Sequence, residues 1–266
     1  MRTISVIGSG ALASIFAKEL KHLLSDDYEI RYVFSKTLSH AQALADVVGA
    51  KATDRFEDLL ENPSDFVVEF AGIGALKAYA KDVLSHNMNL VMASAGALAD
   101  ERFKADLQTT AKTHNVKLYV AGGAIGGLDL MQTFALMGKC ETMIESTKAP
   151  KSLNGAPYLA GRTLSETDIE KVFEGGVKEA IAGFPKNVNV AVTASAASDN
   201  PATTVKLVST PGVSTNTHTI TLKNELMTAT IQIASKPDPQ NPKSSISTAW
   251  SVLALLKNLA SPVVYY

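Results

Sequence analysis

The chain has 266 residues, of which 46% are hydrophobic and 19% charged, and its formal net charge is -1 at pH 7. This length and composition are typical of a globular protein with a sizeable core and room for two modest domains. The near-neutral charge argues against a nucleic-acid binder or a binder of anionic membranes, because both use a basic surface. Cys140 is the single cysteine of the sequence, so a disulfide framework and a thiolate metal cluster are excluded.

The N-terminal residues read directly as a strand, without the pattern of a secretory leader, and no apolar run approaches the length needed to span a bilayer. We therefore expect a cytoplasmic protein that binds neither nucleic acid nor a membrane. No two histidines have the spacing of metal ligands, so no metal site is expected.

The clearest functional signal lies near the N-terminus. An alternating apolar run through Ile7 meets the sequence GSGALA at 8–13, which is followed by a helical pattern. Gly8 permits a tight turn, Gly10 lets the backbone approach a pyrophosphate, and Ala13 is small enough for helix and strand to pack. A glycine turn between any buried strand and helix is the alternative. The preferred interpretation is a dinucleotide site with cofactor contacts from Gly8, Gly10, Ala11 and Leu12.

The second predicted strand, residues 29–34, ends in Ser35-Lys36-Thr37. Units that bind NAD usually place an acidic residue here for the ribose 2'-hydroxyl. A carboxylate would repel the 2'-phosphate of NADP, whereas Lys36 with the hydroxyl of Ser35 could bind it. The pattern therefore favours NADP over NAD as the cofactor, with a solvated loop lysine as the alternative.

Strands alternate with helices as far as residue 121. Further strands are predicted at 65–72, 89–93 and 116–120, and helices at 39–48, 54–61, from 74 and from 100. This alternation predicts a doubly wound, Rossmann-type parallel sheet, an α/β fold whose ligands lie beyond the carboxyl ends of the strands. Small residues at those ends, among them Ala71 and Ala95, stand where a cofactor would pass. The four glycines within 122–127 suggest close backbone approach to a ligand.

Beyond residue 128 the strict alternation stops. Strands are predicted at 140–147, 203–209, 216–222 and 226–234, with helices near 165–182 and 188–197. The expected organisation is a dinucleotide-binding domain at 1–121, an α+β domain for the substrate at 122–240, and a last segment at 241–266 that packs back on the first domain. Its helix should begin near Ser244 or Ser245 and have one apolar face, formed by Ile246, Ala249, Trp250, Leu253 and Ala254.

Six segments in order along nearly the whole chain resemble the L-aspartate dehydrogenase family: GSGALA at 8–13, SAGALAD at 94–100, GGAIGGLD at 122–129, FPKNVNVA at 184–191, NTHTI at 216–220 and NPKSS at 241–245. The resemblance implies NAD(P)-dependent oxidative deamination of L-aspartate to iminosuccinate, or the reverse reductive amination. Iminosuccinate hydrolyses to oxaloacetate and ammonia or can feed quinolinate, and thus NAD, synthesis. The resemblance also implies a homodimer whose contact is carried by the α+β domain.

By the same match, Ala124 and Asn189 fall where the family contacts the nicotinamide cofactor, and His218 falls on the active-site histidine. The family's TRKPP segment reads Ser146-Thr147-Lys148-Ala149-Pro150 here and lacks the arginine. If that arginine bound a substrate carboxylate, Lys148 is the remaining cation of the segment.

The residue types are compatible with these roles. Alternation places His218 on the face of Ile220 and Leu222, so a core histidine is one interpretation, but an imidazole that titrates near neutrality can also activate water at an imine. Of Asn187 and Asn189, one can cap a helix and the other can bind a carboxamide or carboxylate. The cations beside matched motifs, candidates for the substrate's carboxylates, are Lys148, Lys186 and Lys243.

Two alternatives stay open at this point. The missing arginine supports a related Rossmann oxidoreductase that acts on another amino acid, imine or semialdehyde. A nucleotide-binding regulatory protein could instead sense NADP(H) without turnover, but it would have no use for His218 and Asn189 in one cleft. The sequence fixes neither the physiological direction nor the pathway.

Overall fold

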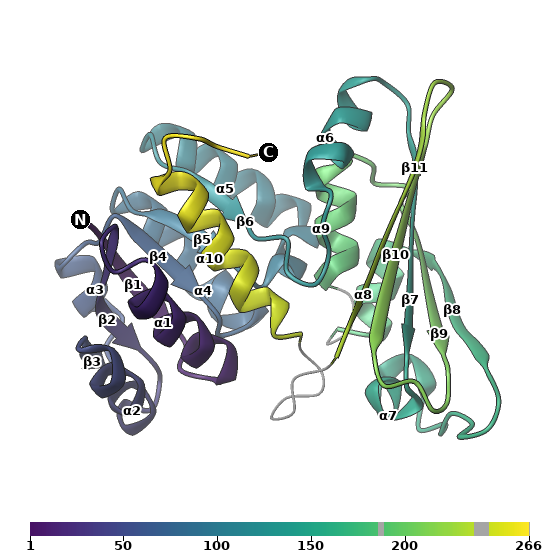
Figure 1. Cartoon of the computed structure of the whole chain (residues 1–266), viewed down its shortest axis with the longest axis horizontal. Helices are drawn as coiled ribbons and strands as arrows, with labels where there is room; N and C mark the ends of the chain where they lie inside the picture. Colours follow the sequence, from purple (N-terminus) through teal and green to yellow (C-terminus); the bar gives the residue numbers. More distant parts are fainter. Residues whose placement is uncertain (186–188, 237–244, 266) are drawn as a thin grey trace. The chain divides into compact units, whose positions relative to one another are not determined.

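The computed structural model describes residues 1–185, 189–236 and 245–265. The chain forms two compact units, shown in Figure 1: unit 1 comprises Met1–Ala121 with Thr248–Tyr266, and unit 2 comprises Gly122–Ser247. Among the residues described, no helix is long and apolar enough to cross a membrane.

Unit 1 is built on a six-stranded parallel sheet with the strand order β3-β2-β1-β4-β5-β6. Its strands are β1 (Arg2–Ile7), β2 (Tyr28–Phe34), β3 (Lys51–Thr53), β4 (Phe66–Glu69), β5 (Asn89–Met92) and β6 (Leu118–Val120). This is the strand order of the doubly wound dinucleotide-binding fold. The predicted Rossmann-type sheet is therefore confirmed.

The helices of unit 1 follow the strands as predicted, to within a few residues. They are α1 (Ala11–Leu23), α2 (Leu38–Val48), α3 (Glu57–Glu61), α4 (Ile73–Ser85), α5 (Glu101–Thr113) and the 3-10 helix η1 (Ala95–Ala99). Helix α2 ends because Gly49 takes up a left-handed conformation with φ 81°. Helix α5 begins where the side chain of Asp100 accepts a hydrogen bond from the amide of Phe103 at 3.2 Å.

The last helix, α10 (Ser247–Ala260), is part of the core of unit 1, and Figure 1 shows it beside α1. Its carbonyl at Leu256 accepts a hydrogen bond of 2.8 Å from the buried hydroxyl of Tyr28. Burying a leucine of this kind contributes roughly 1.5–3 kcal/mol. The side chains that α10 buries in this core recur at the helical spacing of three and four residues. They are Ala249, Val252, Leu253 and Leu256, all at most 4% exposed.

The predicted apolar face of α10 is partly wrong. Ile246 and Trp250 are 40% and 43% exposed, and Ala254 is exposed as well. The helix is rotated so that Val252 and Leu256 face the core, because together with Ala249 and Leu253 they make the continuous stripe that core packing requires. Ser245 accepts a hydrogen bond from the amide of Ser247 at 3.3 Å, whereas Ser244 lies outside the described residues.

Unit 2 is built on a five-stranded mixed sheet with the strand order β11-β10-β7-β9-β8, in which β7 and β9 are parallel and the other neighbours antiparallel. Its strands are β7 (Glu141–Lys148), β8 (Glu170–Gly176), β9 (Thr204–Ser209), β10 (Asn216–Lys223) and β11 (Thr228–Ser235). Its helices are α6 (Leu128–Leu136), α7 (Pro150–Leu153), α8 (Val177–Gly183), α9 (Asn189–Ala197) and the 3-10 helix η2 (Pro157–Leu159). Figure 1 shows α6, α8 and α9 on one face of this sheet, as in the predicted α+β domain.

One helix predicted in this unit is wrong. Within the predicted helix at 165–182, residues 165–169 form a loop, Glu170–Gly176 form the strand β8, and the helix α8 begins only at Val177. Phe173 pairs in register with Leu207 of β9 and packs its ring against Phe184 at 5.8 Å between centroids. Strand pairing and aromatic packing, which depend on distant parts of the chain, here override a local helical pattern.

Candidate active site

The turn between β1 and α1 has the geometry of a phosphate-binding site. Gly8 has φ +107°, and a Cβ there would lie 3.1 Å from the amide nitrogen of Ala71, so only glycine fits without strain. A Cβ at Gly10, by contrast, would meet nothing within 4 Å. Because α1 has no side-chain cap, its first amides and the positive end of its dipole face this open space. Ala11 and Leu12, both half-buried, form the first turn of α1.

Two further loops of unit 1 are held together by one buried carboxylate. Glu69, 1% exposed at the end of β4, accepts hydrogen bonds from the amide of Gly72 at 2.7 Å and from the hydroxyl of Ser94 at 2.9 Å. Burial raises the pKa of this carboxyl group, while these donors act in the opposite direction. Glu69 thereby fixes the loops that contain Ala71, which is exposed, and Ala95, which is buried.

The end of β2 has no acidic side chain. Ser35 is half-buried, and its amide donates to the carbonyl of Thr53 at 3.1 Å, while the neighbouring Lys36 is exposed. An exposed lysine and a hydroxyl at this position suit a 2'-phosphate, because no carboxylate of the segment Ser35-Lys36-Thr37 competes for it. The residues of unit 1 thus fit a dinucleotide.

In unit 2, alternate residues of β7 and β10 are buried on the same face of the sheet, as alternation predicted for His218. At one end of this face the buried side chains are the apolar Ile144, Ile220 and Leu222 and the hydroxyl-bearing Thr142. At the other end they are polar, and we call these residues the polar cluster: Ser146, Lys148, Ser209, Asn216 and His218, each at most 5% exposed. A buried group of this composition is costly unless it is hydrogen-bonded or functional.

Ser146 and His218 lie directly opposite each other on neighbouring antiparallel strands. The hydroxyl of Ser146 and Nδ1 of His218 form a hydrogen bond of 2.8 Å, which fixes the orientation of the ring and leaves Nε2 for a ligand. Burial, reinforced by the positive charge of Lys148, lowers the pKa of His218 to about 3. The imidazole is therefore neutral at physiological pH, instead of titrating near neutrality as the sequence suggested, and it can accept a hydrogen bond.

Lys148 follows Ser146 by two residues on the same face of β7 and lies opposite Ser209 of β9. Burial lowers the pKa of its ammonium group to about 8. The hydroxyl oxygen of Ser209 is buried and has no hydrogen-bond partner within the described part of the chain. The cluster thus contains a titratable amine beside an unsatisfied hydroxyl.

Asn189, the first residue of α9, also has an unsatisfied side chain. Its Oδ1 is buried and has no hydrogen-bond partner among the residues described. Helix α9 runs antiparallel to β7, because Asn200, just after the end of the helix, donates 2.8 Å to the carbonyl of Cys140, just before the start of the strand. The N-terminus of α9, with Asn189, is therefore directed towards the end of β7 that bears the polar cluster.

The glycine-rich segment 122–127 has a packing reason that the sequence did not reveal. A Cβ at Gly127 would lie 2.3 Å from Cδ1 of Ile231, and one at Gly122 would lie 2.9 Å from the carbonyl oxygen of Ile125. The backbone contact at Gly122 and the positive φ of Gly127, +73°, favour glycine at these two positions, so approach of a ligand is not needed to explain them. Ala124 is buried within this segment, at 9% exposure.

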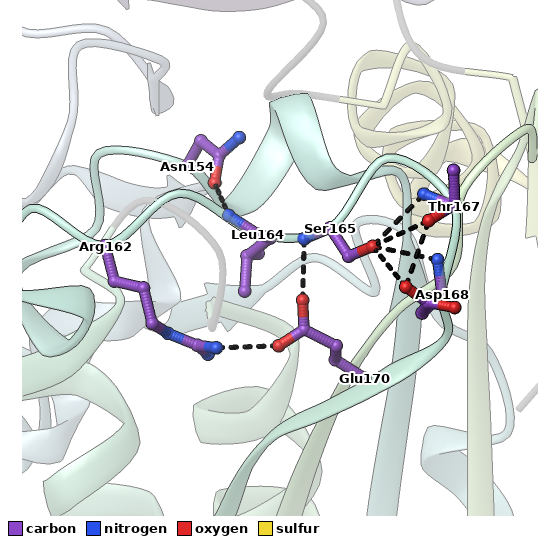
Figure 2. Close-up of polar contacts among 7 residues, drawn as sticks. All are labelled: Asn154, Arg162, Leu164, Ser165, Thr167, Asp168 and Glu170. Carbon is purple, nitrogen blue, oxygen red and sulfur yellow. Dashed lines mark hydrogen bonds and ion pairs between the residues drawn. The ribbon is translucent and has the colours of Figure 1, made fainter.

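Thr147 stands where the family's TRKPP segment has its arginine. The structure shows on which face of the sheet this position lies. Thr147 alternates with Ser146 and Lys148 and so lies on the opposite face of β7 from the polar cluster. The arginine that the sequence does have in unit 2, Arg162, forms an ion pair of 2.7 Å with Glu170 (Figure 2). The other oxygen of Glu170 accepts from the amide of Ser165 at 2.6 Å, so Arg162 is engaged in holding its loop.

Two predicted contacts cannot be placed, because Lys186 and Lys243 lie outside the described residues, as does Asn187.

The sequence analysis also missed residues of the candidate site. Ser146, Ser209 and Asn216 received no role, although the alternation in β7 already placed Ser146 and Lys148 on one face. Their grouping with His218 depends on the register of three strands, which the sequence does not reveal. Among the described residues, no group of three or more His, Cys, Asp or Glu side chains could hold a metal ion.

Comparison with known proteins agrees with this geometry. Residues 8–121 match the model of the homoserine dehydrogenase NAD-binding domain, and residues 129–259 match that of the aspartate dehydrogenase C-terminal domain. L-aspartate dehydrogenases from Methanocaldococcus jannaschii and Methanospirillum hungatei are 34% and 33% identical to the chain, each over 99% of it and over 98% and 99% of their own lengths. The chain belongs to the L-aspartate dehydrogenase family.

This membership confirms the predicted family and enzyme class, an oxidoreductase acting on CH–NH2 groups with a nicotinamide cofactor. The solved structure of aspartate dehydrogenase from Thermotoga maritima covers 100% of both chains at 27% identity, with a TM-score of 0.79. A hyperthermophilic archaeal homoserine dehydrogenase in complex with NADPH, at 11% identity and a TM-score of 0.63, shares the fold.

Proposed function

We propose that this chain catalyses the NAD(P)-dependent oxidative deamination of L-aspartate to iminosuccinate, which hydrolyses to oxaloacetate and ammonia, and the reverse reductive amination. The observation that carries the proposal is the buried polar cluster, in which a neutral imidazole and a titratable amine share one sheet face in unit 2. A packed core has no need of these groups, whereas acid-base chemistry on an amine requires them.

The cofactor half of the proposal rests on unit 1. The β1–α1 turn would hold the pyrophosphate through Gly8, Gly10, Ala11 and Leu12, and the loops joined by Glu69 would contribute contacts from Ala71 and Ala95. Ser35 and Lys36 would bind a 2'-phosphate, so we propose NADP in preference to NAD. When bound, the cofactor supplies the acceptor for the hydride that leaves Cα of the substrate.

The amino acid half rests on unit 2. We assign contacts with the substrate's carboxylates to Lys148 and Lys243 and contacts with the nicotinamide, or with a carboxylate, to Ala124 and Asn189. The unsatisfied Oδ1 of Asn189 supports its assignment, because a buried amide oxygen without a partner has free capacity for a ligand. His218 is the proposed catalytic residue: its neutral ring would orient and deprotonate the water that attacks the imine.

A homodimer is the proposed assembly, implied by the family and supported by the sheet of unit 2. Its outward face presents half-exposed threonines on β10, at Thr217, Thr219 and Thr221, opposite the face on which Figure 1 shows α6, α8 and α9. Light scattering tests this assembly, and a monomer at micromolar concentration would contradict it. The cytoplasmic location and the role in NAD synthesis stay predictions.

The function is tested by following reduced-nicotinamide absorbance with the purified protein at alkaline pH. L-aspartate is compared with D-aspartate, L-glutamate and L-alanine, each with NAD and with NADP, and oxaloacetate plus ammonia is run in reverse. We expect turnover confined to L-aspartate and its reverse reaction, and faster with NADP. Turnover of a different amino acid would reassign the substrate, and tight NADPH binding without any turnover would favour a sensor instead of an enzyme.

A further inference from the structure

Glu69 is the one charged side chain that is buried among the described residues of unit 1, at 1% exposure. Taking a carboxylate out of water is costly unless hydrogen bonds replace its hydration. The other residues of β4, at 66–68, are buried and apolar, as is usual for a strand inside a parallel sheet. Packing alone would be served by one more apolar residue, so the carboxylate at the end of this strand calls for a reason beyond the core.

Glu69 lies where the order of the strands reverses. In the order β3-β2-β1-β4-β5-β6, the chain proceeds from β1 towards one edge of the sheet and from β4 towards the other. As the last residue of β4, Glu69 is in register with Ile7 at the end of β1 and with Met92 at the end of β5. Dinucleotides bind at such a switch point, beyond the carboxyl ends of the strands. The buried carboxylate thus lies at the base of the loops that suit a cofactor.

The carboxylate joins two of these loops through their backbones. Its Oε1 accepts from the amide of Gly72 at 2.7 Å and from the hydroxyl of Ser94 at 2.9 Å, and its Oε2 accepts from the amide of Ser94 at 3.2 Å. Gly72 immediately precedes α4, so the positive end of this 13-residue helix also favours a negative charge here. These contacts tie the loop between β4 and α4 to the loop between β5 and η1.

The loop between β4 and α4 in turn touches the turn between β1 and α1. The amide of Phe70 donates a hydrogen bond of 2.9 Å to the carbonyl of Ile7. A Cβ at Gly8 would lie 3.1 Å from the carbonyl carbon of Phe70 and 3.1 Å from the amide nitrogen of Ala71. The backbone that follows Glu69 is therefore packed against the first glycine of the turn, and a shift of this backbone would disturb all three loops.

We propose that Glu69 is a positioning residue of the cofactor site: by accepting hydrogen bonds from two loops, it holds their backbones in the conformation that receives the dinucleotide. The inference rests on the proposed NAD(P)-dependent function, and in particular on the cofactor contacts proposed for Ala71 and Ala95. It adds a residue that does not touch the cofactor and yet sets the affinity for it.

Glutamine separates this role from the filling of space, because it is nearly the same size as glutamate but accepts through one oxygen only. Whichever way the new amide is turned, its NH2 group meets a backbone N–H, that of Gly72 or that of Ser94. Ser94→Ala is a milder variant that keeps the carboxylate and both amides. Ser64→Ala is the matched control, since Ser64 precedes β4 at its other end and forms a buried hydrogen bond of 2.8 Å with Ser5.

The experiment measures the dissociation constants of NADPH and NADH by fluorescence titration of full-length wild type, Glu69→Gln, Ser94→Ala and Ser64→Ala. The Tm of each protein reports its stability, and KM is measured for NADP and for L-aspartate. Hydrogen–deuterium exchange, followed by mass spectrometry, reports the protection of the peptides that contain Gly72 and Ser94.

In Glu69→Gln the dissociation constant of NADPH and the KM for NADP should rise about 10- to 100-fold, the scale of losing hydrogen bonds to a charged group. Ser94→Ala should raise both about twofold to tenfold, because one of the three bonds is lost. The KM for L-aspartate, whose proposed contacts lie in unit 2, should stay unchanged. The peptides with Gly72 and Ser94 should exchange faster in Glu69→Gln, whereas Ser64→Ala should lower Tm without changing the affinity for NADPH.

Unchanged NADPH affinity in a folded Glu69→Gln protein would overturn the inference. An equal loss of affinity in Ser64→Ala would overturn it as well, because the loss would then reflect a general loosening of the fold. If Glu69→Gln does not fold, Ser94→Ala decides, and wild-type affinity in that variant would count against the inference.

The proposed function can fail separately from this inference. A wild type that binds NADPH without oxidising L-aspartate would contradict the proposed enzyme activity, while the affinities of the variants would still decide the role of Glu69. A wild type that binds neither NADPH nor NADH would overturn both.

Discussion

The two sheets of this protein carry their proposed chemistry in different ways. In unit 1 the strands are filled with apolar side chains, and the groups that suit a ligand are backbone amides and small residues beyond the strand ends, as at Gly8 and Gly10. In unit 2 the groups stand on the strands themselves, as buried side chains of β7, β9 and β10. One site is made by backbone conformation, the other by the register of neighbouring strands.

This difference explains which half of the site the sequence reveals. A backbone site needs glycine where φ is positive or where a ligand approaches, so it leaves a local motif that can be recognised. A side-chain site on a sheet face needs single residues from strands far apart in sequence, such as Ser146 and His218, which are 72 residues apart. No local pattern indicates that these residues meet. The comparison makes predictions that separate the two kinds of site.

The largest expected effect is on turnover, and it should spare the backbone site. His218→Ala should lower kcat by about 10²- to 10⁴-fold, because the group that we propose to activate water is lost. The affinity for NADPH, measured by fluorescence titration, should stay within about twofold, since the phosphate contacts that we propose belong to unit 1. His22→Ala, an exposed histidine in the last turn of α1, is the matched control. Near-native kcat in His218→Ala would reduce this residue to a structural role.

The converse experiment damages the backbone site. Gly10 has φ -76° and ψ -174°, which any residue can adopt, and a Cβ there meets open space. The Gly10→Val protein should therefore fold normally but bind NADPH at least about tenfold more weakly, because the valine side chain fills the space in front of the first amides of α1. Gly8→Ala, by contrast, should lower the free energy of unfolding by roughly 1–3 kcal/mol, since the φ of Gly8 is strained for a residue with a Cβ. Unchanged NADPH affinity in Gly10→Val would remove the pyrophosphate from this turn.

The pH dependence of stability tests the burial of Lys148 without any substrate. The pKa of Lys148 is about 8 in the folded chain, below the ordinary 10.5. Below pH 8 the lysine is charged in both the folded and the unfolded chain, so the whole free-energy cost of burying the charge is present. Between these values the folded chain loses its proton first, and wild type should gain stability relative to Lys148→Met by about 1.4 kcal/mol per pH unit. Urea unfolding at pH 7 to pH 10.5 measures this gain. Parallel stability curves would mean that Lys148 is hydrated.

The smallest effect is expected from the hydrogen bond that orients His218. Ser146→Ala should lower kcat roughly fivefold to tenfold, corresponding to the loss of about 1 kcal/mol, without changing the affinity for NADPH. Thr142→Ala removes another buried hydroxyl on the same face of β7, at the end away from His218, and should leave kcat unchanged. Equal effects of the two substitutions would show that Ser146 acts through packing and not through the imidazole ring.

Much of the fold follows from patterns in the sequence because each pattern is local. The alternation of strands and helices to residue 121 and the period-2 run through His218 predicted the two sheets. Failures arose where tertiary contacts decide the outcome. Strand β8 forms because it pairs with β9, and α10 turns Trp250 outward because Val252 and Leu256 fit the core better. The lowered pKa of Lys148 similarly depends on burial that only the assembled sheet provides.

The most direct test of the central claim follows the hydrogen on Cα. Wild-type protein is given L-aspartate deuterated at Cα with NADP and, separately, with NAD, and the reduced cofactor is analysed by mass spectrometry, with undeuterated L-aspartate as the reference. The account predicts one deuterium in each reduced nicotinamide and oxaloacetate with ammonia as the other products. Reduced cofactor without deuterium, or no reduced cofactor at all, would contradict an L-aspartate dehydrogenase.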